Sequence, residues 1–376
     1  MQANDLRKHL TLDTDHVHLN NAGVGPLTRP AQRAMTDMAA LQGAKGFAAV
    51  PEIIDIYESA RGVFGQLVGV SGHDVSMMQT CAAALSQVAL GLSYNAGDEI
   101  VLCDQEYPSN AYPWFEAAKR NNIEAKVILS EPNLDILLEK LLAAITPKTK
   151  VVAVSWVQYQ SGTCSDIATL KNKCDAVGAW LVVDAIQGLG MIPFPHDKVM
   201  PDAICGGTHK WILGPLGHGF LILPQERREA LAPLLHGAMT YGTPEDLVDR
   251  AKSMRIDATR FEPGNPLLWG AVGGAASLRT LLSIGIHEIH QRAMSLSRQL
   301  LEGLQEQGAQ ILGQPSAHRM SPIVTFKIPH RDMKSLFAHL TANRITGSYR
   351  AGGIRLSPHA YNTEDEIAYV LDLIRQ

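Results

Sequence analysis

The sequence lacks any apolar run long enough to span a membrane, which takes about 18 residues or more. Its charges are interspersed and sum to only −4 at pH 7. It therefore offers neither a basic stripe for nucleic acid nor a polybasic patch for a lipid surface. The N-terminal residues also lack the basic-then-apolar order of a signal peptide. These absences leave a small molecule as the expected partner and the cytoplasm as the expected location.

Cysteine is scarce, and none of the five cysteines belongs to a CxxC pair of the kind found in metal and redox sites. Several lie within apolar runs, where a free thiol behaves as a small hydrophobic group. We therefore expect free thiols, a reducing compartment and no bound metal. The cysteines are Cys81, Cys103, Cys164, Cys174 and Cys205.

What is present has the balance of a globular protein, with 46% apolar and 19% charged residues. Between residues 99 and 223, short β-branched runs largely alternate with helical segments. This alternation is typical of an α/β fold whose mostly parallel sheet carries helices on both faces and binds ligands at the carboxyl ends of its strands. The chain has no phosphate-binding loop of the Gly-x-x-x-x-Gly-Lys-Ser/Thr kind and no Gly-x-Ser-x-Gly elbow, which argues against nucleotide hydrolases and serine hydrolases.

The most informative stretch runs from residue 180 to residue 217. Its first apolar run ends on Asp184, as a buried parallel strand does when it delivers a carboxylate to the edge of a sheet. A later apolar run leads to Lys210, which stands between small residues and Trp211. Loss of water there lowers the pKa of an amine and lets it attack a carbonyl group. A carboxylate for a ring nitrogen, followed by a lysine that can form an imine, is the minimum that a pyridoxal phosphate site requires.

The Asp-x-x-Gln and Thr-His-Lys motifs of this stretch resemble those of the class V aminotransferase family, in its cysteine desulfurase and isopenicillin N epimerase branch. The resemblance covers nearly the whole chain. It implies a PLP-dependent fold type I enzyme with a mostly parallel seven-stranded sheet in a large domain and a smaller α+β domain. In this family Lys210 would carry the cofactor as a Schiff base and later act as the base, while Asp184 would hold the pyridine nitrogen.

After Leu223 the composition shifts, and the remaining third has long helical segments and an alternating strand that indicate a smaller α+β domain, with a boundary near residue 250. We expect an N-terminal segment over residues 1–20 that packs with the small domain. A large cofactor-binding domain would span residues 21–250, and a small C-terminal domain would span residues 251–376.

A predicted helix begins just after residue 80. Thr80 stands at its N-cap, and the small side chains of Cys81 and Ala82 leave the backbone N–H groups open to an anion. In the family this position cradles the cofactor phosphate, although any capped helix after a strand shows the same pattern. Thr208 and His209 flank the lysine and are implied to bind the phosphate as well, with a structural role as the alternative for His209.

Three further residues are implied to contact the cofactor. Tyr107 occupies the place of the ring that stacks on it, and Gln187 that of the amide that donates to its phenolate oxygen. The alternatives are that Tyr107 packs within its own loop and that Gln187 is a solvated turn residue. Asn265 lies in the Arg260–Pro266 segment, which in relatives reaches the active site of the partner subunit and thereby implies a homodimer with shared sites.

The substrate is expected to be an α-amino acid bound near the C-terminus of the chain. Arg355 lies on a short predicted strand, and its guanidinium group suits the substrate carboxylate. Arg350 could reach a distal substrate group, with a packing role as the alternative. Asn21 lies in the Leu-Asn-Asn-Ala-Gly turn, which resembles the family segment beside the substrate carboxylate. An ordinary turn in which Asn20 and Asn21 cap the backbone is the alternative.

Two departures from the cysteine desulfurases bear on the reaction. Tyr107 replaces their histidine, and no cysteine stands between residues 345 and 355, where they carry the sulfur-accepting thiol. Tyr159 is a separate departure, because it stands where the family often has an asparagine beside the cofactor. We therefore predict a C–S lyase type of β-elimination without a persulfide cysteine. An aminotransferase or an amino-acid epimerase is the alternative, and a catalytically inert binding protein of the same fold is the alternative of another class.

Overall fold

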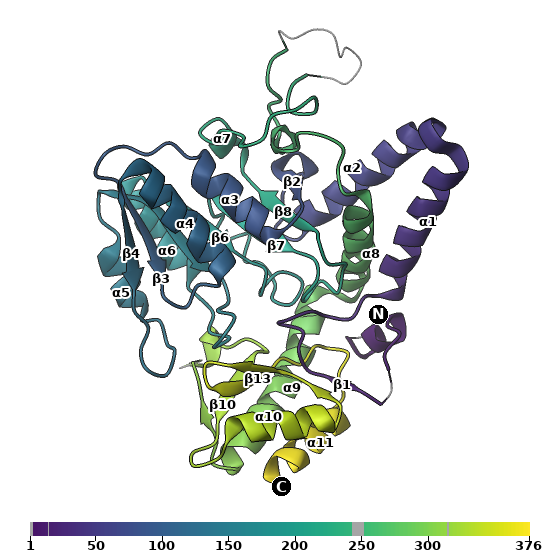
Figure 1. Cartoon of the computed structure of the whole chain (residues 1–376), viewed down its shortest axis with the longest axis vertical. Coiled ribbons are helices and arrows are strands. Elements are labelled where there is room, and N and C mark those ends of the chain that lie inside the picture. The colour runs from purple at the N-terminus through teal and green to yellow at the C-terminus, as the bar shows by residue number, and fades with distance from the viewer. Residues whose placement is uncertain (1–2, 14, 243–251, 314–315) are drawn as a thin grey trace.

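The computed structural model describes residues 3–13, 15–242, 252–313 and 316–376, and Figure 1 shows a large upper body above a smaller lower one. A seven-stranded sheet runs through the upper body in the order β2-β8-β7-β6-β5-β3-β4. Its strands are β2 (Val75–Met78), β3 (Glu99–Cys103), β4 (Glu124–Ile128), β5 (Thr149–Ser155), β6 (Trp180–Asp184), β7 (Ala203–Gly207) and β8 (Gly219–Ile222).

One strand of this sheet runs against the others. β8 pairs antiparallel with both β7 and β2, whereas β7, β6, β5, β3 and β4 pair in parallel. The carboxyl ends of the parallel strands therefore share one edge, where ligands gather in such folds. The predicted α/β class and the mostly parallel seven-stranded sheet are confirmed.

Alternation of side chains sends each strand's residues into two separate cores. In β6, Trp180 and Val182 join the core that contains α3 and α4, while Leu181 and Val183 join the core on the opposite face. A strand buried on both faces needs a continuous apolar run, and β6 has one up to Asp184. The helices are α1 (Arg29–Lys45), α2 (Val50–Gln66), α3 (Cys81–Gly91), α4 (Pro108–Asn121), α5 (Leu138–Ala144), α6 (Ile167–Val177), α7 (Gln225–Arg228) and α8 (Leu268–Ile284).

The lower body is built on a four-stranded antiparallel sheet in the order β12-β13-β10-β9. Helices α9, α10 and α11 pack with it around a third core. Its elements are α9 (Ile286–Glu306), β9 (Gln310–Ile311), β10 (Val324–Lys327), α10 (Met333–Ala342), β11 (Ile345–Thr346), β12 (Ser348–Arg350), β13 (Gly353–Leu356) and α11 (Glu364–Arg375). Short 3-10 helices complete the chain: η1 (Ala3–His9), η2 (Gly46–Ala49), η3 (Gly72–Asp74), η4 (Ala258–Phe261) and η5 (Ala317–Arg319).

The N-terminal segment lies against the lower body. Strand β1 (Val17–His18) pairs in parallel with β11, and Leu19 is buried in the lower core. Helix α8 instead packs against α1 and α2 of the upper body. The predicted boundary between residues 250 and 251 lies outside the described residues, and the division into domains stays a prediction. In the described part of the chain, no helix combines the length and apolar character needed to cross a membrane.

A buried ion pair ties the segment after η4 to the large body. The carboxylate of Glu262 accepts hydrogen bonds from the guanidinium of Arg61 on α2, from the Tyr57 hydroxyl at 3.0 Å and from the Met77 backbone N–H at 2.7 Å. The side chains of Arg61 and Glu262 are only 3% and 10% exposed. Removal of either partner would leave the other charge buried without compensation.

We expect the substitution Glu262→Ala to lower the free energy of unfolding by roughly 3–5 kcal/mol, the usual cost of breaking a buried pair. Glu58 supplies a matched control, because it pairs with the same Arg61 from a side chain that is 53% exposed. Glu58→Ala should cost no more than about 1 kcal/mol. Urea unfolding followed by circular dichroism measures both, and equal losses would contradict the assignment of Glu262 as the main partner.

Candidate active site

Asp184 lies at the carboxyl end of β6 and is buried. Its Oδ1 accepts the Ile186 backbone N–H at 3.0 Å and the Cys81 thiol at 3.4 Å. Its Oδ2 has no hydrogen-bond donor among the described residues. Burial raises the pKa of this carboxyl group, while the nearby Lys210 opposes the rise. A protonated ring nitrogen at Oδ2 would supply the positive partner that favours the carboxylate form.

Lys210 follows β7 in a turn at the same edge of the sheet. Its Nζ lies over the ring of Tyr107, 5.7 Å from the ring centroid. Desolvation lowers the pKa of this amine to about 8, although Asp184 acts in the opposite direction. A larger fraction of the amine is therefore neutral and nucleophilic near neutral pH than for an ordinary lysine.

Contacts from distant parts of the chain fix the backbone around Lys210. The carbonyl of His209 accepts the Gly25 N–H at 2.8 Å, and that of Trp211 lies 3.1 Å from Nε2 of His359. A Cβ on Gly25 would overlap the Lys210 carbonyl oxygen, so a larger residue does not fit there. The N-terminal turn and the C-terminal body together hold the lysine turn in place.

The N-terminus of α3 lies beside these residues. The Thr80 side chain caps the helix by accepting the Ala83 N–H at 3.0 Å. The N–H groups of Cys81 and Ala82 have no acceptor among the described residues and are open to an anion. Gly219 of β8 approaches so closely that a Cβ there would lie 2.5 Å from the Cys81 nitrogen. These N–H groups fit a phosphate group.

The two residues before Lys210 point to different environments. Thr208 is fully buried and its hydroxyl donates to the Pro215 carbonyl at 2.7 Å, while its methyl group packs against Gly274 of α8. The structure thus directs this hydroxyl into the loop between β7 and β8, while the methyl group fills the close gap between the lysine turn and α8. His209 is half-buried, and desolvation together with Lys210 lowers its pKa to about 4. Its ring is therefore neutral and can donate one N–H group.

Gln187 is held in one orientation by two partners. Its Oε1 accepts the Trp211 indole N–H at 2.8 Å, and its Nε2 donates to the Ala22 carbonyl at 3.0 Å. Because an indole only donates and a carbonyl only accepts, the positions of the amide oxygen and nitrogen are determined. The second N–H group of Nε2 has no described acceptor and can serve a ligand.

Arg355 projects from β13 and is buried. Its Nη1 donates to the Tyr159 carbonyl at 2.6 Å and its Nη2 to Oδ1 of Asn20 at 3.1 Å. Its Nε is buried and has no hydrogen-bond partner in the described part of the chain. Burial and the neighbouring Arg350 lower its pKa to about 10. A buried guanidinium with an unused donor fits a carboxylate ligand.

Asn21 is used structurally: its side chain donates to the Ser357 carbonyl at 2.9 Å and accepts the Tyr361 hydroxyl at 2.9 Å. Tyr107 and Tyr159 meet edge to face with ring centroids 5.0 Å apart. Arg350 on β12 is exposed and influences the pKa values of both Tyr159 and Arg355.

Asn265 is exposed on the segment between η4 and α8. It has no described contact with Lys210 or Asp184. The structure therefore brings Tyr107, Asp184, Lys210, Arg350 and Arg355 into one electrostatic neighbourhood but leaves Asn265 apart from them.

The sequence interpretation missed two polar residues of this region. Asn20, next to the predicted Asn21, is the residue that contacts Arg355. Glu106 is buried beside Tyr107 and accepts hydrogen bonds from Ser155, Asn110 and Gln158. A carboxylate between a strand end and a candidate site residue was the available signal for Glu106. No signal in a single sequence separates Asn20 from Asn21.

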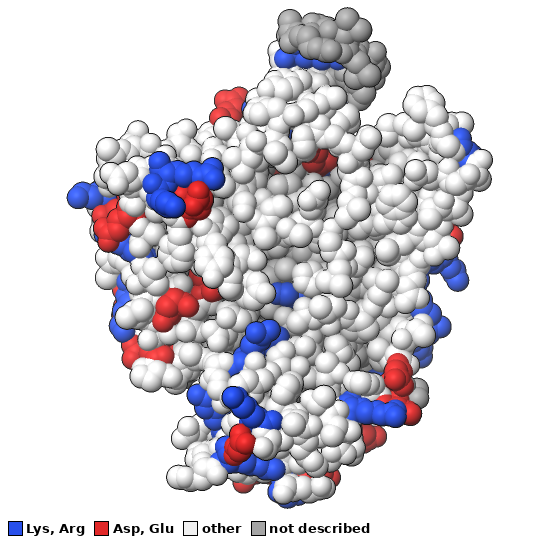
Figure 2. Space-filling view, in the orientation of Figure 1, with Lys and Arg blue, Asp and Glu red and all other residues white. Residues whose placement is uncertain are grey.

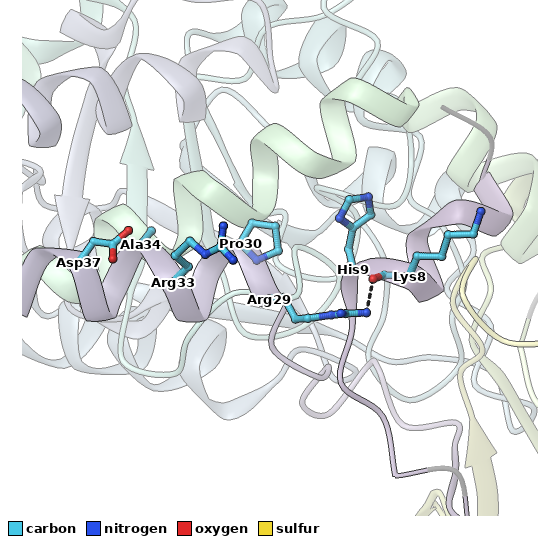
Figure 3. Close-up of a pocket in the computed structure, with 7 residues that line it drawn as sticks. All are labelled: Lys8, His9, Arg29, Pro30, Arg33, Ala34 and Asp37. Carbon is cyan, nitrogen blue, oxygen red and sulfur yellow. Dashed lines mark hydrogen bonds between the residues drawn. The ribbon is translucent and has the colours of Figure 1, made fainter.

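Another hollow of the surface lies between η1 and the start of α1, away from this site (Figure 3). Arg29 there donates to the Lys8 carbonyl, while the side chains of Arg33 and Asp37 are exposed. The hollow shares none of the residues described above, and it contributes nothing to the candidate active site.

The sequence profile of the Aminotransferase class-V family matches residues 27–370. A probable cysteine desulfurase of Pyrococcus abyssi is 27% identical over 394 aligned positions, which cover 99% of this chain and 96% of that protein. The similarity therefore includes every element that carries a candidate site residue.

Two solved structures share the fold. The apo cysteine desulfurase of Thermococcus onnurineus NA1 superposes with a TM-score of 0.90 at 24% identity, over 100% of this chain and 98% of that one. The cystine C–S lyase C-DES, in complex with its product cysteine persulfide, gives a TM-score of 0.88 at 22% identity, over 96% and 98%. The matched residues include the N-terminus of α3, Asp184 at the end of β6 and Lys210 after β7. The chain belongs to the class V aminotransferase family of pyridoxal phosphate-dependent enzymes.

Proposed function

We propose that this enzyme acts on an α-amino acid with a sulfur or another leaving group on its β-carbon, and that it catalyses β-elimination without a persulfide cysteine. The observation that carries this proposal is the state of the thiols. Four of the five cysteines are buried, and Cys164 is half-buried. Burial raises the pKa of Cys81, Cys103 and Cys205 well above the usual range and that of Cys164 and Cys174 to about 12.

The residues of the site fit pyridoxal phosphate. Lys210 would bind it covalently, Asp184 would hold its ring nitrogen, and Tyr107 would cover one face of the ring. The free N–H group of Gln187 would meet the phenolate oxygen. The phosphate would lie at the N-terminus of α3, with contributions from Thr80, Cys81, Ala82 and His209, and with Asn265 reaching it from a partner subunit. Thr208 would line the phosphate site beside His209, although its hydroxyl and its backbone N–H already donate to the carbonyls of Pro215 and His218.

When bound, the cofactor supplies an electron-accepting ring that stabilises negative charge at the substrate α-carbon. Arg355 would hold the substrate carboxylate with its guanidinium group and so fix the α-carbon near Lys210. Nζ of Lys210 would then take the α-proton. Asn21 would act indirectly, because its side chain donates to the Ser357 carbonyl and so holds the N-terminal turn in place. Arg350 would bind a distal anionic group of the substrate.

Loss of the β-substituent as a thiol is the step that separates elimination from desulfuration. A desulfurase needs an accessible thiolate that attacks the substrate sulfur. The last cysteine of the chain is Cys205, and it lies within β7, next to Asp184 on β6. The β-strand and loop before Arg355 contain no sulfur nucleophile, so the sulfur would leave with the product.

We expect incubation with L-cysteine or L-cystine to give pyruvate, while the mass of the intact chain stays unchanged. Mass spectrometry of the protein and a pyruvate assay measure the two outcomes on the same sample. A stoichiometric sulfur adduct that a thiol reagent removes would contradict the proposal. A keto-acid-dependent amino exchange without pyruvate would favour an aminotransferase instead.

The lowered pKa of Lys210 predicts how fast the cofactor-free protein takes up pyridoxal phosphate. Only the neutral amine attacks the aldehyde, so the rate of covalent binding should rise with pH and level off near the pKa of about 8. The absorbance change on mixing gives this rate. Lys210→Ala should bind no cofactor covalently, and borohydride reduction should label Lys210 in the unchanged protein. A rate that still rises well beyond that pKa, or a label on another lysine, would contradict the assignment.

We further propose a homodimer that works in a reducing compartment such as the cytoplasm. All five thiols are free. Several large apolar side chains are exposed, among them Phe47 at 90%, Ile256 at 85%, Leu216 at 65% and Leu235 at 65%. Figure 2 shows few charged side chains over the upper centre of the molecule. A subunit interface would bury side chains of this kind if they lie together on one face.

We expect sedimentation to show a dimer and subunit exchange to reveal shared sites. Lys210→Ala and Asn265→Ala should each be inactive or weakly active. After the two are mixed, each hybrid dimer would contain one site with both native residues, so activity should reappear. A fully active monomer, or mixing that restores nothing although the subunits exchange, would contradict the shared site.

A further inference from the structure

The carboxylate of Glu106 is buried between two loops at the carboxyl edge of the sheet. One loop joins β3 to α4 and carries Tyr107, and the other follows β5 and carries Tyr159. β3 and β5 are neighbours and run in parallel, so both loops leave the sheet at the same edge. Glu106 is 6% exposed and lies one residue before Tyr107.

Donors from both loops surround this carboxylate. Its Oε1 accepts the Ser155 backbone N–H at 2.9 Å, the Gln158 side-chain amide at 2.8 Å and the Cys103 thiol at 3.2 Å. Its Oε2 accepts the Ser155 hydroxyl at 2.5 Å and the Asn110 side-chain amide at 2.7 Å. Glu106 thus joins the end of β3, the start of α4, the end of β5 and the loop after it.

The directions of these hydrogen bonds are determined by their surroundings. The Trp114 indole donates to Oδ1 of Asn110 at 3.0 Å, which leaves the amide nitrogen of Asn110 facing Glu106. The backbone N–H of Ser155 is a donor only. Burial raises the pKa of Glu106, but the hydrogen bonds from Ser155, Gln158 and Asn110 lower it. An array made of donors is complete only when its acceptor is a carboxylate.

The loops joined in this way carry the two rings of the site. Tyr107 and Tyr159 meet edge to face with centroids 5.0 Å apart, and Nζ of Lys210 lies 5.7 Å from the centroid of Tyr107. The Tyr159 carbonyl also accepts Nη1 of Arg355. A shift of either loop would therefore move a ring over the lysine and a contact of the carboxylate-binding arginine together.

We propose that Glu106 is a positioning residue, whose buried carboxylate holds the Tyr107 and Tyr159 loops in register so that Tyr107 covers the cofactor ring above Lys210. The role is indirect, because the hydrogen bonds that the carboxylate makes within the described chain all go to these loops and to the strand and helix ends beside them. The proposal rests on the proposed function insofar as it requires Tyr107 to contact the cofactor.

The test is Glu106→Gln, which keeps size and shape but places an NH₂ group among donors. The protein reconstituted with pyridoxal phosphate should still carry the cofactor on Lys210, as borohydride reduction and peptide mapping show. Its visible circular dichroism band, which reports the asymmetric setting of the bound ring, should lose most of its amplitude or change sign.

Glu99→Gln is the matched control, because Glu99 is also buried but lies at the opposite, amino end of β3, where it pairs with Lys126 at 2.7 Å. It should leave the visible band unchanged.

Ser155→Ala removes only one donor and should alter the band in the same direction as Glu106→Gln. This second variant decides the question if Glu106→Gln does not fold. An unchanged band in the folded variants would overturn the positioning role. A wild-type protein without any such band or lysine label would overturn the proposed cofactor site instead.

Discussion

The site depends on the shared burial of the Lys210 amine and the Asp184 carboxylate. Desolvation alone pushes both groups toward their neutral forms, lowering one pKa and raising the other, while their mutual attraction opposes both shifts. The two groups sit at the exits of two neighbouring strands and make no direct hydrogen bond, so the carboxylate retains a free oxygen and the lysine retains a usable lone pair. In a direct ion pair, the lysine would stay protonated and the carboxylate oxygen would be occupied, so neither group could act on a ligand.

The sheet explains why Asp184 and Lys210 meet although they are far apart in the sequence. β6 and β7 are adjacent and parallel, with Asp184 opposite Cys205. Both strands therefore lead into loops at one edge of the sheet. The antiparallel β8 then returns along β7 and brings Gly219 against the N-terminus of α3. A side chain there would occupy the space beside the N–H groups that suit a phosphate, so the glycine and the helix terminus form one feature.

The sequence was sufficient to predict the sheet, with Asp184 at the end of one strand and Lys210 in the turn after the next, because both positions follow from local apolar runs. It was insufficient for side-chain direction. Thr208 and His209 are adjacent and polar, yet the Thr208 hydroxyl donates to the Pro215 carbonyl of the following loop, and its methyl group faces Gly274 of α8. Asn20 and Asn21 likewise differ only in which side of the turn they face: one meets Arg355 and the other Tyr361. Such differences depend on contacts made in the folded chain, with α8 for Thr208 and between the two ends of the chain for Asn20 and Asn21, which no local pattern encodes.

The same long-range contacts couple the two bodies at the site. Arg355 of the lower body is held by Asn20 from the N-terminal turn and by the Tyr159 carbonyl from the upper body, and His359 reaches the carbonyl next to Lys210. A carboxylate that binds Arg355 would thus engage a group already attached to the loop of Tyr159. Because that loop is joined through Glu106 to the loop of Tyr107, a single connected set of contacts extends from the guanidinium of Arg355 to the ring near the lysine. The positions of the Arg355 guanidinium and of the Tyr107 ring are then determined by one network and not by two independent ones.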